Sequence, residues 1–237
     1  MYLGRIVGVG LTGNGAPFAA YGITGRSEKS KRRVARISDD GRTIKILPLD
    51  ELTPEQEKIK DLIIYTAFRT DPTGSVMFVT NGRQTDPMVE ALQKDPRRAR
   101  TTIVESVLEE MGAEPDEPIC TARIASSVDG MTREAVLGTV TRSHAATAVP
   151  ITLKERGKAL CISTYAGDEK DPAPDEFDAL LDIVRHVEIV GESAEEISSA
   201  FYAWLEETNP GLVVCSAAAC WNERGSRWDL AVKNLHH

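Results

Sequence analysis

The apolar residues of this chain fall mostly into short runs that end at turn residues, a pattern typical of β-strands. The first run covers residues 3–10, and Gly13-Asn14-Gly15 predicts a tight turn before a partner strand at 17–23. Asp71-Pro72-Thr73-Gly74 predicts a second hairpin, between strands at 62–70 and 75–81. Further strands are expected at 121–128, 135–141, 148–153, 158–164, 183–190, 212–221 and 227–233.

Helical signals occupy two separate blocks. Residues 87–111 read as helical, but Pro96 must divide or kink this stretch, because proline lacks an N–H donor and clashes with the preceding turn. Gly112 then ends it. The capping signature Ser193-Ala194-Glu195-Glu196 predicts another helix, which runs to about Thr208.

The order of these elements predicts the fold class. Strands follow one another in hairpins, and helices do not come after every strand. This pattern favours antiparallel sheets with helices packed outside them over a doubly wound parallel sheet. We therefore expect one α+β domain over residues 1–237, with a loop rich in acidic residues and proline at 167–176.

Composition narrows the possible partners. The 237 residues carry a formal net charge of −8, with 41% hydrophobic and 27% charged residues, as in an ordinary soluble globular protein. The negative balance argues against non-specific binding to nucleic acid or to an anionic membrane surface. No apolar run approaches the ~20 residues of a membrane helix, and the N-terminus lacks a signal-peptide pattern. We expect a cytoplasmic protein.

Several familiar kinds of site are not indicated. Residues 8–13 match the dinucleotide fingerprint G-x-G-x-x-G, but they lead into another strand, where the fingerprint needs a helix, so a glycine-rich hairpin is the better interpretation. The sequence G-x-S-x-G of serine hydrolases does not occur. The cysteines lack C-x-x-C spacing and the internal histidines stand apart, which predicts buried free thiols and no metal site at Cys120, Cys161, Cys215, Cys220, His144 and His186.

Two runs, at 21–27 and 80–86, combine backbone-permissive residues with hydrogen-bonding side chains and an arginine. Arg26 offers a planar fork to phosphate oxygens, and Ser27 adds a hydroxyl. Asn81 and Asp86 could bind sugar hydroxyls or an amide, with Gly82 allowing close approach of the backbone. The basic stretch 26–36 fits either a local anion site or a solvated loop.

Three further residues are candidates for chemistry. Arg123 lies in an otherwise apolar strand, and an unpaired buried charge is costly, so it either forms a structural ion pair or contacts a ligand. Glu117 and Tyr65 are each compatible with a structural role. If the carboxylate, the phenol and the arginine met in one cleft, they could transfer protons and stabilise an oxyanion.

Short motifs spread over nearly the whole chain add a resemblance. They are Met1-Tyr2-Leu3-Gly4-Arg5, Phe18-Ala19-Ala20-Tyr21, Arg26-Ser27, Asn81-Gly82 with Thr85-Asp86, Thr121-Ala122-Arg123-Ile124-Ala125, Ser163-Thr164-Tyr165, and Ala217-Ala218-Ala219 through Trp228-Asp229-Leu230-Ala231. With these motifs the chain resembles the archaeal-type IMP cyclohydrolase family, which closes the purine ring in the last step of inosine monophosphate synthesis.

The resemblance implies a fold and a reaction. The fold is like that of the N-terminal-nucleophile hydrolases, a four-layer αββα sandwich of two antiparallel sheets flanked by helices. Those hydrolases attack with an N-terminal Cys, Ser or Thr, whereas this chain begins Met1-Tyr2, which disfavours amide hydrolysis. The implied substrate is a purine-precursor ribonucleotide whose formamido and carboxamide groups join with loss of water. Neither a cofactor nor a metal is implied, and a homo-oligomer is compatible with the sequence.

The resemblance also suggests roles for the candidate residues. Arg26 and Ser27 would bind phosphate, Asn81 and Asp86 would bind ribose or base, and Arg123 would stabilise charge, while Tyr65 and Glu117 would move protons or orient the carboxamide. Further substrate contacts are expected from Tyr21, Gly82, Arg83 and Thr164.

Two positions depart from the family pattern. An arginine is expected directly after the first tyrosine, where this chain has Gly22, and a small or polar residue is expected where it has Arg83. If the missing arginine binds phosphate, Arg26 or Arg83 must compensate for it. The alternative is a non-catalytic purine-nucleotide-binding paralogue, or a similar enzyme that acts on a related ligand.

Overall fold

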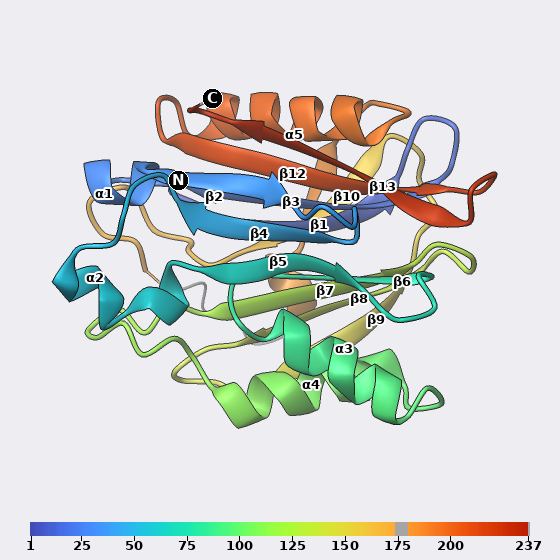
Figure 1. Cartoon of the computed structure of the whole chain (residues 1–237), viewed down its shortest axis with the longest axis horizontal. Coiled ribbons are helices and arrows are strands. Elements are labelled where there is room, and N and C mark those ends of the chain that lie inside the picture. Colours follow the sequence, from blue (N-terminus) through green and yellow to red (C-terminus); the bar gives the residue numbers. More distant parts are fainter. Residues whose placement is uncertain (174–179, 237) are drawn as a thin grey trace.

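Two antiparallel sheets form the centre of the computed structural model, which describes residues 1–173 and 180–236 (Figure 1). The first sheet has the order β11-β10-β1-β2-β12-β13, and the second has the order β3-β4-β5-β6-β7-β8-β9. The first contains β1 (Arg5–Leu11), β2 (Pro17–Thr24), β10 (Lys158–Ser163), β11 (Arg185–Glu188), β12 (Val213–Asn222) and β13 (Arg227–Asn234). The second contains β3 (Arg33–Ile37), β4 (Thr43–Pro48), β5 (Tyr65–Thr70), β6 (Val76–Thr80), β7 (Arg123–Asp129), β8 (Glu134–Val140) and β9 (Thr147–Thr152).

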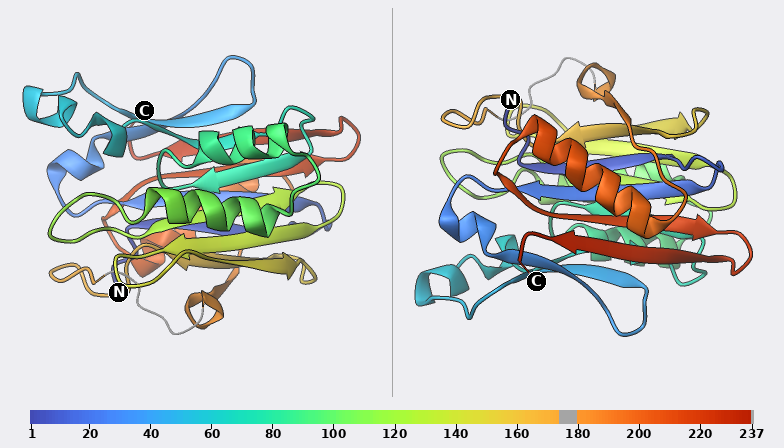
Figure 2. Two further views of the ribbon diagram at one scale, coloured as in Figure 1. Left: turned by 90° about the horizontal axis from the view of Figure 1, so that it is seen from below. Right: turned by 90° about the horizontal axis from the view of Figure 1, so that it is seen from above.

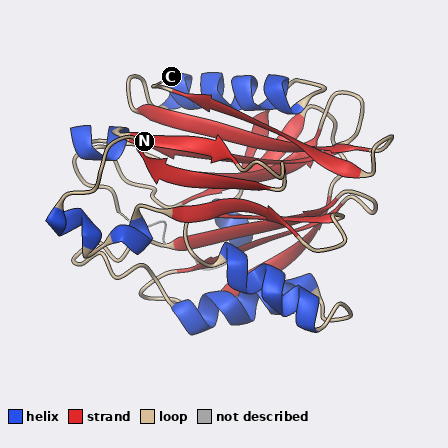
Figure 3. Cartoon of the chain, in the orientation of Figure 1, coloured by secondary structure: helices blue, strands red, loops and turns tan. Residues whose placement is uncertain are grey.

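Helices cover the outer faces of both sheets (Figures 2 and 3). Helix α5 (Ala194–Thr208) lies across the first sheet, whereas α3 (Thr85–Lys94) and α4 (Arg100–Met111) lie across the second. Shorter helices are α1 (Glu28–Lys31), α2 (Pro54–Glu57), η1 (Lys60–Leu62) and η2 (Leu180–Ile183). The expected α+β class and four-layer αββα arrangement are confirmed, while the likeness to N-terminal-nucleophile hydrolases stays a prediction. None of the described helices is long and apolar enough to cross a bilayer.

The core has three apolar layers because side chains alternate between the two faces of a strand. Between the sheets, Val7, Val9 and Tyr21 pack against residues of β5, β6 and β7. On the opposite face of the first sheet, Ile6 and Phe18 pack against α5. The outer face of the second sheet packs in the same way against α3 and α4.

Local turn and capping signals predicted most elements well. Both hairpins form as expected, and the helical stretch is divided around Pro96 into α3 and α4. Gly112 ends α4 with φ = 61°. Ser193 caps α5 by accepting a hydrogen bond from the Glu196 N–H, but the Glu196 carboxylate accepts from the N–H of Glu192, so the reciprocal half of a capping box is absent there.

Other elements were not predicted. Helix α1 and most of β3 lie in the basic stretch 26–36, which the sequence suggested as an anion site or a solvated loop. No element was predicted at β4, and the short helices α2, η1 and η2 were not predicted either. The expected acid-rich loop 167–176 is described as far as residue 173, and residues 174–176 lie outside the described residues.

The two ends of the sandwich contain different strand ends and turns. At one end, β1, β3, β5 and β7 begin and β2 and β6 end; we call it the Arg5 end. At the other end lie the turns of the β1–β2, β3–β4, β5–β6 and β12–β13 hairpins; we call it the Trp221 end. The residues that carried the family resemblance cluster mainly at the Arg5 end.

Candidate active site

A closed ring of hydrogen bonds and ion pairs lies buried at the Arg5 end, and we call it the charged ring. Its members come from β1, from the loop after β6, from the loop after α4 and from the start of β7: Arg5, Asn81, Gln84, Glu114 and Arg123. Each is at least nine-tenths buried. Residues that are far apart in sequence therefore meet in one water-poor site, where charges interact strongly.

The ion pairs of the charged ring converge on Glu114. Arg5 binds this carboxylate with both nitrogens of its fork, at 2.7 Å (Nη2 to Oε2) and 3.0 Å (Nη1 to Oε1). Arg123 approaches the same carboxylate, with Nη1 3.6 Å from Oε1. One buried anion thus faces two cations, and the cluster carries a net positive charge that favours an anionic ligand.

Amide groups close the charged ring and hold the loop after β6 against β7. The Asn81 amide donates to Ala122 O at 2.9 Å and accepts from Ile124 N at 2.9 Å. Gln84 donates to Asn81 Oδ1 at 2.7 Å and accepts from Arg123 Nη1 at 3.2 Å. A side chain at Gly82 would lie 2.7 Å from Gln84 Oε1 and 2.9 Å from Arg123 Nη1, so only glycine fits here without displacing the charged ring.

Two buried phenols lie beside the charged ring. The hydroxyls of Tyr21 and Tyr65 are 2.7 Å apart and share a hydrogen bond. Burial raises the pKa of both tyrosines, although the nearby charge of Arg5 opposes this rise. Burial would lower the pKa of Arg5, but the charge of Glu114 and the two phenols outweigh it and raise that pKa well above its ordinary value. Arg5 therefore stays a cation, and the phenols stay neutral in the physiological range.

A cavity of about 490 Å³ opens onto the charged ring, a size typical of small-molecule sites. Arg5 and Glu114 reach it from the ring. Its remaining walls are mixed, with basic, hydroxyl, acidic and aliphatic side chains from Arg26, Arg33, Thr24, Ser27, Ser30, Asp116, Ile23, Ile59, Leu62 and Ile63. The side chain of Arg33 has no hydrogen bond or ion pair to residues 1–173 or 180–236, so its guanidinium is available to a ligand, and its charge acts on the nearby Tyr65.

Aromatic side chains form another wall of this cavity. The rings of Tyr2 and Tyr165 stack at a centroid distance of 5.6 Å, and the Arg26 guanidinium lies over Tyr2 at 5.3 Å. The Tyr165 hydroxyl is hydrogen-bonded to Thr121 Oγ1, which also bonds to Asp116. This wall is therefore held in place by stacking and hydrogen bonds, and it gives the cavity an aromatic lining.

The structure brings many of the predicted site residues together at the Arg5 end. Arg26 and Ser27 line the cavity, and Tyr21 and Tyr65 lie beside the charged ring. Asn81, Gly82 and Arg123 are in the ring or against it, but they do not line the cavity. Thr164 is buried next to them and accepts a hydrogen bond from Arg5 N at 3.1 Å, so it supports the backbone of β1.

Three predicted residues lie elsewhere. Glu117 is exposed and pairs with Arg142 at 3.2 Å; the carboxylate that meets Arg123 is Glu114, three residues earlier. Asp86 lies in the first turn of α3 and pairs with Arg69 of β5 at 2.7 Å, on the outer face of the second sheet. Arg83 is exposed and pairs with Asp61. The sequence left open whether Glu117 meets Tyr65 and Arg123 in one cleft; in the structure Glu117 pairs with Arg142 at the surface, and Glu114 is the carboxylate beside Arg123.

Gly22 faces away from the cavity. Tyr21 points between the sheets, so the alternation of β2 directs position 22 towards α5. A Cβ atom there would lie 2.3 Å from Leu205 Cδ1 of α5. The glycine at this position therefore serves close packing of β2 on α5, and a side chain here would not reach the phosphate site expected at Arg26.

The residues missed by the sequence analysis are Arg5 and Arg33 at the cavity, together with Glu114 and Gln84 of the ring. The importance of Arg5 could have been predicted from the sequence. Arg5 begins an apolar strand, so its charge needs a buried partner, as was argued for Arg123. Within 1–173 and 180–236, no three His, Cys, Asp or Glu side chains gather in a way that could hold a metal ion.

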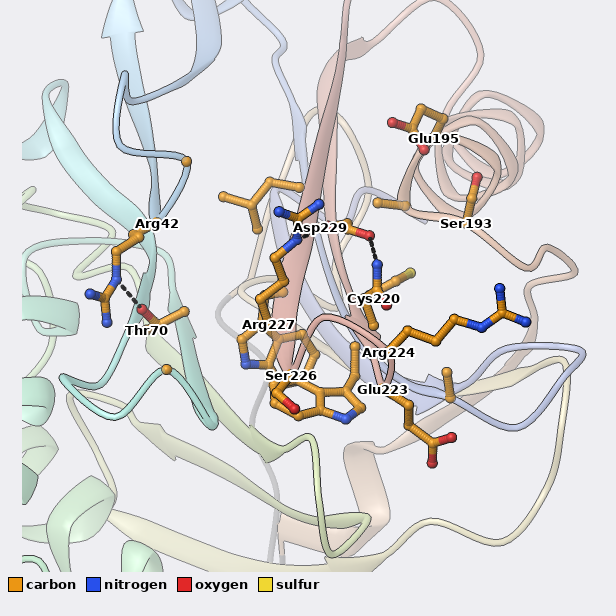
Figure 4. Close-up of a pocket in the computed structure, with 18 of the residues that line it drawn as sticks. Arg42, Thr70, Ser193, Glu195, Cys220, Glu223, Arg224, Ser226, Arg227 and Asp229 are labelled. Carbon is orange, nitrogen blue, oxygen red and sulfur yellow. Dashed lines mark hydrogen bonds and ion pairs between the residues drawn. The ribbon is translucent and has the colours of Figure 1, made fainter.

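A larger hollow, of about 1,080 Å³, lies at the Trp221 end (Figure 4). Its arginines are all exposed: Arg42, Arg133, Arg224 and Arg227. Arg42 donates to Thr70 Oγ1 at 3.2 Å, while Arg224 and Glu223 extend away from it. Arg227 pairs with Asp229 at 3.1 Å. These arginines either bind other protein groups or point away from one another. The hollow therefore lacks the buried charges that converge on one carboxylate at the Arg5 end.

Comparison with known proteins identifies the family. The family model described as "IMP cyclohydrolase-like protein" matches residues 2–225. The chain belongs to this family. Its relatives in the IMP cyclohydrolase-like family include proteins named IMP cyclohydrolase from several archaea.

The similarity to these family members extends over most of each chain. The IMP cyclohydrolase of Methanocaldococcus jannaschii is 31% identical over 219 residues, which cover 92% of this chain and 93% of the relative. That of Methanothrix thermoacetophila is 30% identical over 234 residues, 99% of each chain. That of Methanococcus maripaludis is 30% identical over 213 residues, 89% of this chain and 92% of the relative.

Proposed function

We propose that this protein catalyses the dehydrative ring closure of 5-formamidoimidazole-4-carboxamide ribonucleotide to inosine monophosphate. Membership of the IMP cyclohydrolase-like family supports the activity. The observation that carries the proposal is the Arg5–Glu114 pair, which is almost fully buried and yet opens onto a nucleotide-sized cavity beside Arg26 and Arg33. This arrangement provides a cation and a carboxylate for reaction next to cations for a phosphate.

Phosphate binding falls to the outer part of the cavity. Arg26 and Arg33 offer guanidinium forks, which match phosphate oxygens in two-point contacts. The hydroxyls of Ser27 and Ser30 lie in the same wall and can donate to the remaining oxygens. Arg26 retains its position over Tyr2, which keeps the fork oriented and lowers the entropy lost on binding.

The heterocycle and the ribose require different surfaces. Tyr165 and Tyr2 give a flat aromatic wall for the imidazole ring, and Ile59, Leu62 and Ile63 add apolar contacts. Asp116 is the acceptor for ribose hydroxyls. Asn81 and Asp86, which the sequence suggested for ribose or base, do not serve here: the Asn81 amide is fully engaged with β7 and Gln84, and Asp86 lies in α3 on the outer face of the second sheet.

The chemistry joins two groups of one molecule, so no second substrate enters. The carboxamide nitrogen attacks the formyl carbon, a C–N bond forms, and the formyl oxygen becomes a hydroxyl that leaves as water after protonation. Arg5 stabilises negative charge on that oxygen, for which one well-placed donor is typically worth roughly 3–4 kcal/mol. Glu114 takes a proton from the carboxamide nitrogen and delivers it to the formyl oxygen. The second proton of the departing water comes from the formamido N–H, and that nitrogen forms the C=N bond of the ring as the water leaves.

Tyr65 and Tyr21 support this exchange from behind Arg5. Their raised pKa values keep both hydroxyls protonated, so the pair acts as a neutral hydrogen-bond donor beside Arg5. A near-attack arrangement of the two reacting groups supplies the rest of the acceleration. Intramolecular reactions gain about 7–11 kcal/mol in this way, part of which the substrate already has.

The test is to mix the purified protein with the formamido ribonucleotide and to follow inosine monophosphate by chromatography. We expect stoichiometric product at a rate proportional to protein concentration. Arg224→Gln, at the Trp221 end, is the matched control and should keep full activity. Tight binding of the ribonucleotide without any turnover would contradict the proposal and favour the non-catalytic nucleotide-binding paralogue.

A further inference from the structure

The charged ring has an inner and an outer part. Arg5 and Glu114 line the cavity, whereas Asn81, Gln84 and Arg123 lie behind them and do not. Arg123 is only 4% exposed, and its Nε atom has no hydrogen-bond partner among the described residues. A buried cation with an unsatisfied donor is costly for folding. This cost indicates that Arg123 has a role other than stabilising the fold.

The contacts of Arg123 point to Glu114. Its Nη1 atom lies between Gln84 Oε1 at 3.2 Å and Glu114 Oε1 at 3.6 Å. Gln84 is held in turn by Asn81 at 2.7 Å, and Gly82 leaves room for this approach. The guanidinium is thus fixed from behind by neutral amides, and its charge acts on the carboxylate.

We propose that Arg123 is a positioning residue, anchored by Gln84, that keeps the Glu114 carboxylate paired and aimed into the cavity. The catalytic meaning of this role rests on the proposed function. Because Arg5 binds both oxygens of Glu114, it can turn towards negative charge on the substrate only if another cation stays with the carboxylate. Arg123 is that cation, and it frees Arg5 to act on the reacting oxygen.

The charged groups around Glu114 are few, which makes the proposal testable by single substitutions. Arg5 and Arg123 face it as cations, Tyr65 interacts with it electrostatically, and Asp116 is its nearest acidic neighbour along the chain. Without Arg123, Arg5 is the one cation that pairs with this carboxylate among the described residues, so Arg5 should stay bound to Glu114 and no longer turn towards the substrate.

The test compares Arg123→Met, Arg123→Lys and Gln84→Met with the surface control Arg142→Met. In Arg123→Met we expect kcat to fall by about tenfold or more while KM changes by less than about threefold. Arg123→Lys restores the cation and should recover much of kcat, and Arg142→Met should behave as wild type.

Other outcomes overturn the proposal. A rise in KM with unchanged kcat would make Arg123 a substrate ligand, and a loss of kcat that Arg123→Lys does not recover would reduce it to a structural residue. Gln84→Met leaves every charge in place and removes only the anchor, so it provides a second variant if Arg123→Met does not fold. It should lower kcat with little change in KM, by a smaller factor than Arg123→Met.

A measurement without substrate separates this proposal from the proposed function. Glutamate labelled with ¹³C at the carboxyl carbon is incorporated into the whole protein, and the Glu114 signal is assigned with Glu114→Gln. The chemical shift of this signal at neutral pH should change in Arg123→Met and stay unchanged in Arg142→Met, because only Arg123 lies against the carboxylate. An unchanged Glu114 signal in Arg123→Met would refute the role of Arg123. If wild-type protein forms no inosine monophosphate, the proposed function is wrong, while this comparison still decides what Arg123 does.

Discussion

At the Arg5 end, Arg5 and Arg123 are buried and share a single carboxylate, whereas at the Trp221 end Arg42, Arg224 and Arg227 are exposed and point to different partners. The hollow at the Trp221 end is the larger of the two, at about 1,080 Å³ against 490 Å³. Exposed charges are screened by water, and surface pairs contribute little energy. Size therefore does not mark the functional site; converging, desolvated charges do.

Replacement of Arg5 should give the largest difference between the two ends. Arg5→Met leaves Glu114 with only the more distant Arg123, and breaking a buried ion pair costs about 3–5 kcal/mol of stability. The loss of its donor should also lower kcat roughly 100- to 1,000-fold. Kinetics and urea denaturation measure both effects. Arg227→Met is the control at the other end, and an equal loss in that variant would contradict the comparison.

Alkaline pH tests whether the Arg5 end is dry. Burial raises the pKa of Cys215, which lies beside Tyr21, from 9.0 to about 12. Because the folded thiol keeps its proton while the unfolded thiol ionises, its stabilising contribution is complete below pH 9 and is lost between pH 9 and 12. The free energy of unfolding should fall in this window by up to about 1.4 kcal/mol per pH unit for this group.

Urea denaturation at several pH values provides the measurement, and Cys215→Ala is the matched variant. Its free energy of unfolding should fall less steeply above pH 9 than that of the wild type. Parallel slopes in the two proteins would mean that water reaches this thiol in the folded state.

A substitution at Gly22 tests whether this position of β2 affects only the packing on α5 or also the activity. Gly22→Ala places a methyl group 2.3 Å from Leu205 Cδ1, and overpacking of this kind typically costs about 1–3 kcal/mol. Because position 22 faces α5, kcat of the folded variant should stay within twofold of wild type. Thermal denaturation and kinetics measure the two effects. A selective loss of phosphate affinity would show that this position communicates with the cavity.

The smallest effect is expected from the pair of Arg83 and Asp61, which is exposed although it lies near the cavity. Surface pairs of this kind contribute little and are screened by salt. Asp61→Asn should change KM by less than about twofold. Arg83→Gln should do the same, and steady-state kinetics at low and high salt check both. A tenfold rise in KM for Arg83→Gln alone would restore Arg83 as a substrate ligand.

Local signals explain how much of the fold could be predicted. Hairpin turns, the break at Pro96 and the cap at Ser193 depend on a few adjacent residues, and each was predicted correctly. The β3–β4 hairpin was missed although Ile44-Lys45-Ile46 alternates, because the basic residues around Arg33 dominated the interpretation of that stretch. Alternation over so few residues is a weak signal beside a charge run.

The site was harder to predict than the fold because it depends on contacts between distant residues. Glu114 and Glu117 belong to one acidic stretch, and nothing local distinguishes them; the difference is that Arg5, 109 residues away, meets only Glu114. Asn81 looked like a ligand-binding side chain, but backbone atoms of β7 and the amide of Gln84 satisfy it. The types of side chain in the sequence therefore pointed to the residues of the Arg5 end, but they did not show which of these residues line the cavity and which only support it.

The two glutamates therefore give the most direct test of the central claim, that the buried charges at the Arg5 end form the active site. In the cyclisation assay, Glu114→Gln should lower kcat by about 100-fold or more, since it removes the proton-transferring group. Glu117→Gln, which differs only in the carboxylate that faces Arg142 at the surface, should keep nearly all of the activity. Full activity in Glu114→Gln, or loss of activity only in Glu117→Gln, would contradict the account.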